Sequence, residues 1–264
     1  MIESLLQQNI EEIVRQSASF MTRDFSVKSK GTIANQVTSN DVAVEQFLKQ
    51  NLSALLPGCG FIAEESESEY RGREFVFVID PIDGTANYVR DLGASGISVG
   101  LLKNMEPFIS VVYNPTRNEL FSARKGAGAF LNGEKISVSD RDMAHSCFCT
   151  SLSCYRKERG ENCAKILNRV FQEAEDFRRF GAAVIELTAL AAGRVELYYE
   201  PALAPWDHGA SRLIIEEAGG ILDNVYPSGI TYERQMAVIA ANNRENLEKL
   251  RSIILEVVPK EEEL

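Results

Sequence analysis

The sequence predicts an α/β fold, in which helices and strands alternate along one chain. Apolar residues recur at helical spacing from Ile2 to Val14, which predicts an amphipathic helix. The run Phe75–Ile79 is continuously apolar and β-favouring, as expected for a strand buried on both faces. A chain of 264 residues, 45% of them apolar, can fill one large core. We therefore expect a single domain over 1–264, in which two subdomains could meet near 140–150.

The N-terminal half is predicted to pair two helices with a sheet. The first helix runs toward Met21, and residues 24–35 form a polar connection. Thr38 or Ser39 caps a second helix, which Pro57-Gly58 stops. Strands are predicted at 75–79, 96–102, 108–113 and 119–123. Turn signals between the last three predict an antiparallel meander.

The C-terminal half continues the alternation. Strands are predicted at 147–151, 195–199 and 236–240. Helices are predicted at 156–171, 182–192 and 206–218, and a terminal helix follows the last strand. Gly193 and Gly219-Gly220 supply the glycines that commonly end helices.

The charge of the chain excludes some ligands. A net charge of −10 and a pI near 4.9, without a basic stripe, make nucleic acid an unlikely primary ligand. The same charge would repel a phosphorylated substrate, so local cations would have to reverse the field at such a site. Bound metal is the obvious source.

Compartment and membrane association can also be predicted. The five cysteines are an odd number in a mid-sized chain, which favours reduced thiols and the cytoplasm. Residues 1–20 carry charges among their apolar positions, so they lack the centre of a signal peptide. No stretch is long enough to span a bilayer, and we expect no membrane partner.

The most informative segment is 80–87, which follows the apolar strand. The proline after Asp80 fixes the backbone, so that the carboxylates of Asp80 and Asp83 can converge. Gly84 lets the chain turn, and the N–H groups of a helix beginning at Thr85 would face an anion. A cation and a phosphate could therefore share this site. In isolation, the segment could equally be an ordinary turn.

Two further acidic positions could join this site. Glu64-Glu65 follows an apolar pair, and Asp207 lies at the start of a predicted helix. Alone, the glutamates would be a solvated pair. Oxygen ligands without cysteine or histidine favour magnesium, manganese or calcium over zinc.

At these residues the sequence resembles the inositol monophosphatase family. Residues 80–87 are similar to its first signature and 206–220 to its second. Residues 37–41 and 63–66 match two further family segments in the same order. The resemblance implies a layered α/β sandwich of alternating helices and sheets, related to that of fructose 1,6-bisphosphatase. It also implies a homodimer.

The resemblance implies a ligand set for Mg²⁺. Glu64, Asp80 and the backbone carbonyl of Ile82 would hold the first ion. Asp80, Asp83 and Asp207 would hold a second, and Glu64 a weaker third. The expected cofactor is therefore two or three Mg²⁺ per active site.

Catalytic and substrate-binding roles are implied in the same way. Thr85 with Asp41 would orient and deprotonate the attacking water, with Glu64 acting through its metal. The amides of Gly84 and Thr85 would bind the phosphate, beside Asp83 and Asp207. Glu200 would bind substrate hydroxyls, and Ala183 would help to shape their pocket.

The implied activity is magnesium-dependent, lithium-sensitive hydrolysis of inositol 1-phosphate or a related polyol or sugar phosphate by metal-activated water. Fructose 1,6-bisphosphate, a nucleotide 3′-phosphate and histidinol phosphate are alternatives on the same fold. The leaving-group pocket, near Ser153, Arg178, Glu200 and His208, is expected to decide between them. A lone histidine is more often structural than catalytic, so His208 is expected to cap or line the start of its helix. A regulatory metal-binding protein without catalysis is the alternative of another class.

Overall fold

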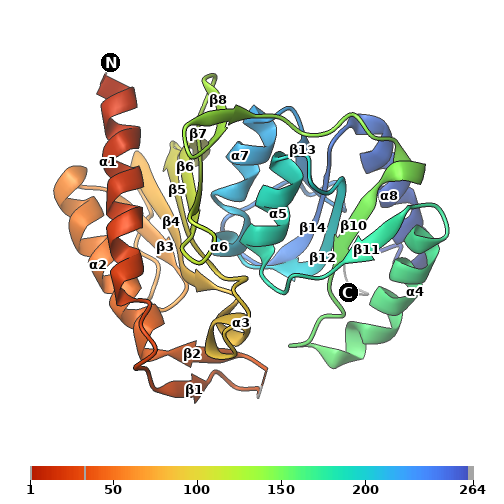
Figure 1. The fold of residues 1–264 in the computed structure, drawn as a ribbon, viewed down its shortest axis with the longest axis horizontal. Coiled ribbons are helices and arrows are strands. Elements are labelled where there is room, and N and C mark those ends of the chain that lie inside the picture. The colour runs from red at the N-terminus through yellow and green to blue at the C-terminus, as the bar shows by residue number, and fades with distance from the viewer. Residues whose placement is uncertain (1, 33, 261–264) are drawn as a thin grey trace.

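The computed structural model describes residues 2–32 and 34–260, and its helices and sheets alternate in layers (Figure 1). Helices α1 (Ile2–Ser17) and α2 (Ser39–Leu55) cover the outer face of a seven-stranded sheet. Helices α5 (Ala183–Ala191) and α7 (Ser211–Glu217) lie between this sheet and a five-stranded one. The five-stranded sheet is covered in turn by α4 (Gly160–Phe171) and α8 (Arg244–Val257). The predicted layered α/β sandwich is confirmed.

The seven-stranded sheet follows chain order. Its strands are β3 (Gly60–Ala63), β4 (Phe75–Asp83), β5 (Gly96–Lys103), β6 (Glu106–Asn114), β7 (Glu119–Arg124), β8 (Gly128–Leu131) and β9 (Glu134–Ile136). Only β3 and β4 are parallel, so the predicted antiparallel meander is confirmed. Strands β3, β8 and β9 were not predicted, because three or four residues are too few to display a period.

Strand β4 does not end at Ile79, as predicted, but continues to Asp83. Asp80 pairs with Ser98 and Asp83 with Gly96, so three steps along β4 oppose two along β5. This extra residue is a β-bulge, and a bulge accommodates a proline that cannot donate a hydrogen bond. In a regular strand, residues 80 and 83 would point to opposite faces. The bulge allows both carboxylates to reach one site.

The five-stranded sheet has the order β11 (Asp176–Arg178), β10 (Cys147–Thr150), β12 (Leu197–Leu203), β14 (Met236–Ala241) and β13 (Ile221–Asn224). The first three strands are parallel, and β14 is antiparallel to both of its neighbours. The strand predicted at 195–199 lies at 197–203. The short strands β11 and β13 carry polar residues and were not predicted.

The helix predicted at 206–218 is in fact two helices. Helix α6 (Pro205–His208) ends before Gly209, and α7 begins at Ser211. A Cβ atom on Gly209 would lie 2.6 Å from Cγ1 of Val78. Glycine therefore lets this helical corner pack directly on β4 and brings Asp207 beside the end of that strand.

Smaller elements surround the end of β4. The connection predicted at 24–35 contains β1 (Val27–Ser29), which pairs with β2 (Gln36–Thr38). The predicted cap Thr38 forms a capping box with Asp41 at the start of α2. Helix α3 (Thr85–Val89) begins at Thr85, as the motif predicted. Figure 1 shows β1, β2 and α3 together at one edge of the molecule. Within the described residues, no helix is both long and apolar enough to cross a membrane.

Candidate active site

Three carboxylates converge where β4 meets α6. Asp80 and Asp83 come from the bulged end of β4, and Asp207 comes from α6. One carboxylate oxygen from each lies within 4.8 Å of the others. The structure thus brings Asp207 beside two residues that lie more than 120 positions earlier in the sequence.

Backbone amides fix two of these carboxylates. The amide of Val184 donates to Oδ2 of Asp83 at 2.7 Å, and the amide of Ala204 donates to Oδ2 of Asp207 at 2.7 Å. Asp80 is 1% exposed, and its Oδ1 has no hydrogen-bond partner among the described residues. A buried carboxylate oxygen without a partner is costly, so this atom is suited to bind a cation.

The electrostatics of the cluster also favour a cation. Burial, followed by the charge of Glu64, raises the pKa of Asp80 well above its usual value. Burial likewise raises the pKa of Asp83 to about 7. It also raises the pKa of Asp207, with the charge of Asp83 as the next cause. A divalent cation would relieve this repulsion, and the oxygen-only ligand set fits Mg²⁺.

Glu64 lies beside this cluster and is held by a lysine. Nζ of Lys30 donates to Glu64 at 3.0 Å and also pairs with Glu65. Burial raises the pKa of Glu64 despite this lysine. Sequence reasoning missed Lys30, because it lies in a polar connection with no motif to distinguish it.

Asp41 and Thr85 are joined by a hydrogen bond. Oγ1 of Thr85 lies 3.2 Å from Oδ1 of Asp41 and 3.0 Å from the carbonyl oxygen of Ile82. Asp41 is fully buried, and burial raises the pKa of its carboxyl group. The capping box with Thr38 fixes the other oxygen of Asp41. The Thr85 hydroxyl can therefore pass a proton to Oδ1 of Asp41.

Gly84 forms the turn between β4 and α3. Its φ angle is +79°, in the left-handed region that favours glycine. A Cβ atom here would lie 2.8 Å from Cβ of Ala182 and 2.9 Å from the carbonyl oxygen of Ala94. The position therefore requires glycine twice over, once for its conformation and once for space.

A cleft of about 610 Å³ opens onto the acidic cluster. Asp83, Asp207, Ala183 and Glu200 all line it, as does Ser153. Glu200 accepts a hydrogen bond from the neighbouring Ser151 hydroxyl. Burial raises the pKa of Glu200 to about 7. A carboxyl group with this pKa can either donate to or accept from a hydroxyl near neutral pH.

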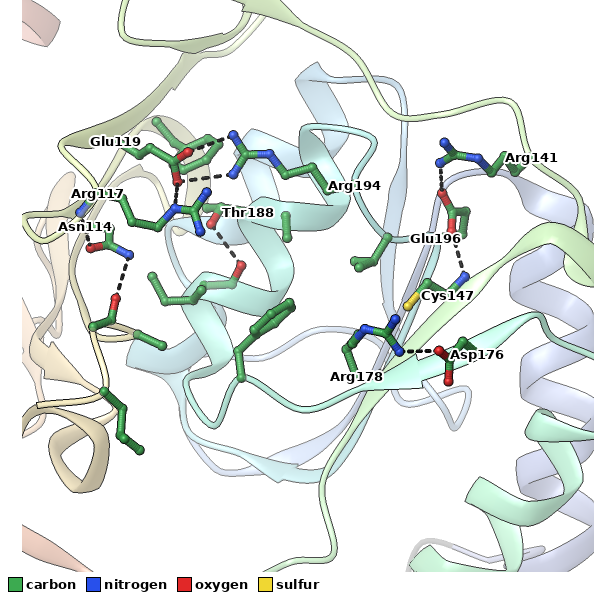
Figure 2. A pocket seen from close by; sticks show the side chains of 18 of the residues that line it. Asn114, Arg117, Glu119, Arg141, Cys147, Asp176, Arg178, Thr188, Arg194 and Glu196 are labelled. Carbon is green, nitrogen blue, oxygen red and sulfur yellow. Dashed lines mark hydrogen bonds and ion pairs between the residues drawn. The ribbon is translucent and has the colours of Figure 1, made fainter. Parts of the chain in front are cut away.

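Two residues expected near the leaving-group pocket lie outside the cleft. His208 is fully buried and stacks on Tyr232, with ring centroids 5.6 Å apart, so it does not reach the cleft. Burial lowers its pKa to about 3, which keeps the ring neutral. Arg178 lines a second cavity, where it pairs with Asp176 (Figure 2). Its neighbour Arg179 lines the cleft instead.

The model of the inositol monophosphatase family matches residues 2–258. The chain belongs to the inositol monophosphatase family. The carboxylate cluster and the Asp41–Thr85 pair lie within the matched region, so the geometry above is that of a family member.

Relatives and solved structures agree with this membership. The inositol monophosphatase of Dictyostelium discoideum is 34% identical over 244 residues, which are 90% of this chain and 89% of that protein. The Nus factor SuhB of Escherichia coli K12 is 36% identical over 210 residues, 79% of this chain and 78% of that protein. The solved inositol monophosphatase from Anabaena (Nostoc) sp. PCC 7120 is 26% identical, with a TM-score of 0.84 and 97% coverage of both chains.

Proposed function

We propose that this protein is a magnesium-dependent phosphomonoesterase that hydrolyses inositol 1-phosphate or a related polyol or sugar phosphate. The observation that carries the proposal is the convergence of Asp80, Asp83 and Asp207 beside a cleft that Asp83 and Asp207 line. Phosphate monoesters react so slowly in water that enzymes must accelerate them by up to about 10²¹-fold. Such chemistry needs concentrated positive charge, which these carboxylates can hold as metal ions.

Two or three Mg²⁺ per site are proposed. Asp80, Asp83 and Asp207 would hold one ion. Glu64, Asp80 and the carbonyl oxygen of Ile82 would hold another, although Glu64 is also paired with Lys30. When bound, Mg²⁺ offsets the charge of the phosphoryl oxygens and lowers the pKa of water. The unpartnered Oδ1 of Asp80 and the raised pKa values of the cluster support this assignment.

Thr85 and Asp41 are proposed to handle the proton of the attacking water. The Thr85 hydroxyl can accept that proton while it passes its own to Asp41, because the two oxygens lie 3.2 Å apart. Burial raises the pKa of Asp41, which makes its carboxylate a stronger base. The nucleophile is then water, and no covalent phosphoenzyme is required.

The cleft offers positions for both ends of the substrate. The amides of Gly84 and Thr85, at the start of α3, would bind phosphoryl oxygens. Glu200 would bind hydroxyl groups of the leaving alcohol, and Ala183 leaves room for them. Bound metal ions and the attacking water would contact only the phosphoryl group. The metal-binding and water-activating residues would therefore not distinguish inositol 1-phosphate from fructose 1,6-bisphosphate, a nucleotide 3′-phosphate or histidinol phosphate.

A regulatory role is the second candidate. It is supported by similarity to proteins named Nus factor SuhB, at 36% identity in Escherichia coli. The complete set of carboxylates argues for retained catalysis, since a purely regulatory protein would not need it.

The homodimer remains a prediction. The five free cysteines support the proposal that the protein works in a reducing compartment such as the cytoplasm.

The test is phosphate release from inositol 1-phosphate, fructose 1,6-bisphosphate, adenosine 3′,5′-bisphosphate and histidinol phosphate, with and without Mg²⁺. The control is the Asp83→Asn protein, which should be nearly inactive. Magnesium-dependent release from at least one ester supports the phosphomonoesterase. Absence of release from all four, with a folded protein, would move the regulatory role to first place.

A further inference from the structure

Charges of opposite sign occupy different depths of the catalytic cleft. The acidic side chains that line it belong to Asp83, Glu186, Glu200 and Asp207, and burial raises the pKa of each. Arg90, Arg156 and Arg179 line the same cleft and are exposed. The cleft therefore has an acidic floor, where metal ions are proposed, and a cationic rim.

The three rim arginines come from separate segments of the chain. Arg90 follows α3, Arg156 lies in the loop between β10 and α4, and Arg179 follows β11. Three connections from both halves of the fold thus each place an arginine at the lining of one cavity. The three arginines therefore do not belong to one surface helix or to one run of charged residues.

None of the three rim arginines forms an ion pair with a carboxylate in residues 2–32 or 34–260. Nη1 of Arg90 donates only to the carbonyl oxygen of Ala86, at 3.1 Å. Arg179 is close enough to lower the pKa of Glu186 and Glu200 but bonds to neither. Their guanidinium groups thus retain donors for a ligand.

The second cavity, of about 550 Å³, provides an internal comparison. Four arginines line it, and all four are paired with carboxylates (Figure 2). Arg194 and Arg117 both bind Glu119, Arg141 binds Glu196 at 2.7 Å, and Arg178 binds Asp176. Each arginine of that cavity is therefore neutralised by a carboxylate, whereas the arginines at the rim of the catalytic cleft are not.

We propose that Arg90, Arg156 and Arg179 form a second anion-binding subsite, which selects phosphate esters whose leaving group carries its own phosphate or other anionic group. This inference rests on the proposed phosphomonoesterase function. The reacting phosphoryl group would lie at the acidic floor with its metal ions. The second anionic group would lie at the rim, where guanidinium groups match its geometry.

The size and the charge of the cleft fit such a substrate. Its volume of about 610 Å³ is typical of sites that enclose molecules as large as a sugar bisphosphate or a nucleotide. The chain carries a net charge of −10, so a substrate with two anionic groups would otherwise be repelled. Arginines at the rim reverse that field where the substrate enters.

The first experiment compares substrates in steady-state kinetics with saturating Mg²⁺. The wild-type kcat/KM should be higher for fructose 1,6-bisphosphate or adenosine 3′,5′-bisphosphate than for inositol 1-phosphate. The sugar and nucleotide arms then identify which kind of leaving group carries the second anion. Equal or lower kcat/KM for both bisphosphates would overturn the proposal while leaving the phosphomonoesterase itself established.

Rim variants test whether the arginines cause the preference. Arg179→Ala and Arg156→Ala should each raise KM for the preferred bisphosphate by about tenfold, because each removes a charge-assisted contact. Their KM for inositol 1-phosphate should change by less than about twofold, since its leaving group has no second anion to lose. Equal effects on both substrates would overturn the proposal.

Arg178→Ala is the matched control for Arg179→Ala. It removes the same charge one residue away, but its side chain lies in the second cavity with Asp176. It should leave the substrate preference unchanged. A shift in preference as large as that of Arg179→Ala would show that net charge, rather than the rim, is responsible.

A binding measurement separates failure of this inference from failure of the proposed function. Calorimetry in EDTA with fructose 6-phosphate and with adenosine 5′-phosphate offers the phosphate of each ligand to the rim, because without Mg²⁺ the acidic floor repels that phosphate and the ester is not hydrolysed. Binding by the wild type that is lost in an Arg156→Ala, Arg179→Ala double variant and kept in Arg178→Ala supports the subsite, even if turnover is absent. Lack of binding by the wild type to both ligands overturns it.

Discussion

Replacing Asp83 with asparagine should act in opposite directions on stability and on catalysis. Burial raises the pKa of Asp83 from 3.8 to about 7, and the negative charge of Glu64 adds to this rise. Each pKa unit corresponds to about 1.4 kcal/mol, so an ionised Asp83 costs about 4 kcal/mol above pH 7 in the absence of metal. Asp83 lines the cleft and is partly exposed, so we expect about 1 to 3 kcal/mol after screening by solvent.

The sign of the pH dependence follows from the same pKa. Between pH 4 and 7, the folded protein keeps a proton on Asp83 that the unfolded chain has lost. This contribution to stability is therefore present at low pH and is lost as pH rises through about 7. Asparagine has no charge to bury. The metal-free variant should exceed the wild type in free energy of unfolding at pH 8, and by less at pH 5.

The assay is urea unfolding of both proteins in EDTA and in Mg²⁺, at pH 5 and pH 8. The amide oxygen of asparagine can still accept from Val184, so the local fold should persist. Mg²⁺ should stabilise the wild type much more than the variant, whose turnover should fall by about 1,000-fold or more because a metal ligand is lost. Asp24→Asn, at an exposed position, is the control. A variant less stable than the wild type in EDTA at pH 8 would refute the reasoning.

Three further outcomes are expected. Thr85→Ala should lower kcat by about 100-fold or more with little change in KM, because the hydroxyl that links water to Asp41 is lost; Thr85→Ser should restore much of the rate, and a Ser variant as slow as the Ala variant would contradict the proton path. Gly84→Ala should lower the free energy of unfolding by about 2 to 4 kcal/mol, since its Cβ would meet Ala182 and Ala94 at a φ of +79°. The control is Gly58→Ala, which shares the positive φ but has open space around it, and equal losses for both would rule out crowding as the cause. Mg²⁺ at a hundredfold excess over its Kd should stabilise the wild type by about 2.7 kcal/mol in urea unfolding at pH 8. The gain should be smaller at pH 5, where protons compete for the carboxylates, and a gain independent of pH would argue against this site.

The sequence predicted the fold where local patterns were long. The apolar run at 75–79 and the meander after it were recognisable because buried strands and alternating turns have strong local signals. Short edge strands such as β11 were missed, because three residues show no local period and are paired only through tertiary contacts. The continuation of β4 through the bulge was missed for a related reason, since proline normally marks the end of a strand.

The site could be predicted where geometry follows from a motif, but not where it depends on the orientation of a side chain. Asp80 and Asp83 lie close in sequence, and their convergence was predicted. His208 follows Asp207, but successive side chains on a helix point about 100° apart. The ring therefore packs on Tyr232 instead of entering the cleft.

Arg178 and Arg179 illustrate the same limit. Arg178 ends β11 and Arg179 follows the strand, and only Arg179 lines the cleft. The sequence did not reveal which of the two lines the cleft, because β11 itself was not recognised.

Lys30 lies 34 positions from Glu64 and carries no periodic signal, so only the folded structure reveals their contact.

The central claim is that the carboxylate cluster holds Mg²⁺ for the hydrolysis of a phosphate monoester. It is tested most directly by phosphate release from EDTA-treated protein, measured over the ester panel before and after Mg²⁺ is restored. We predict no release without the metal, recovery in the wild type when it is added, and no recovery in Asp83→Asn. Release that persists in EDTA, or an Asp83→Asn protein that recovers as fully as the wild type, would contradict the claim.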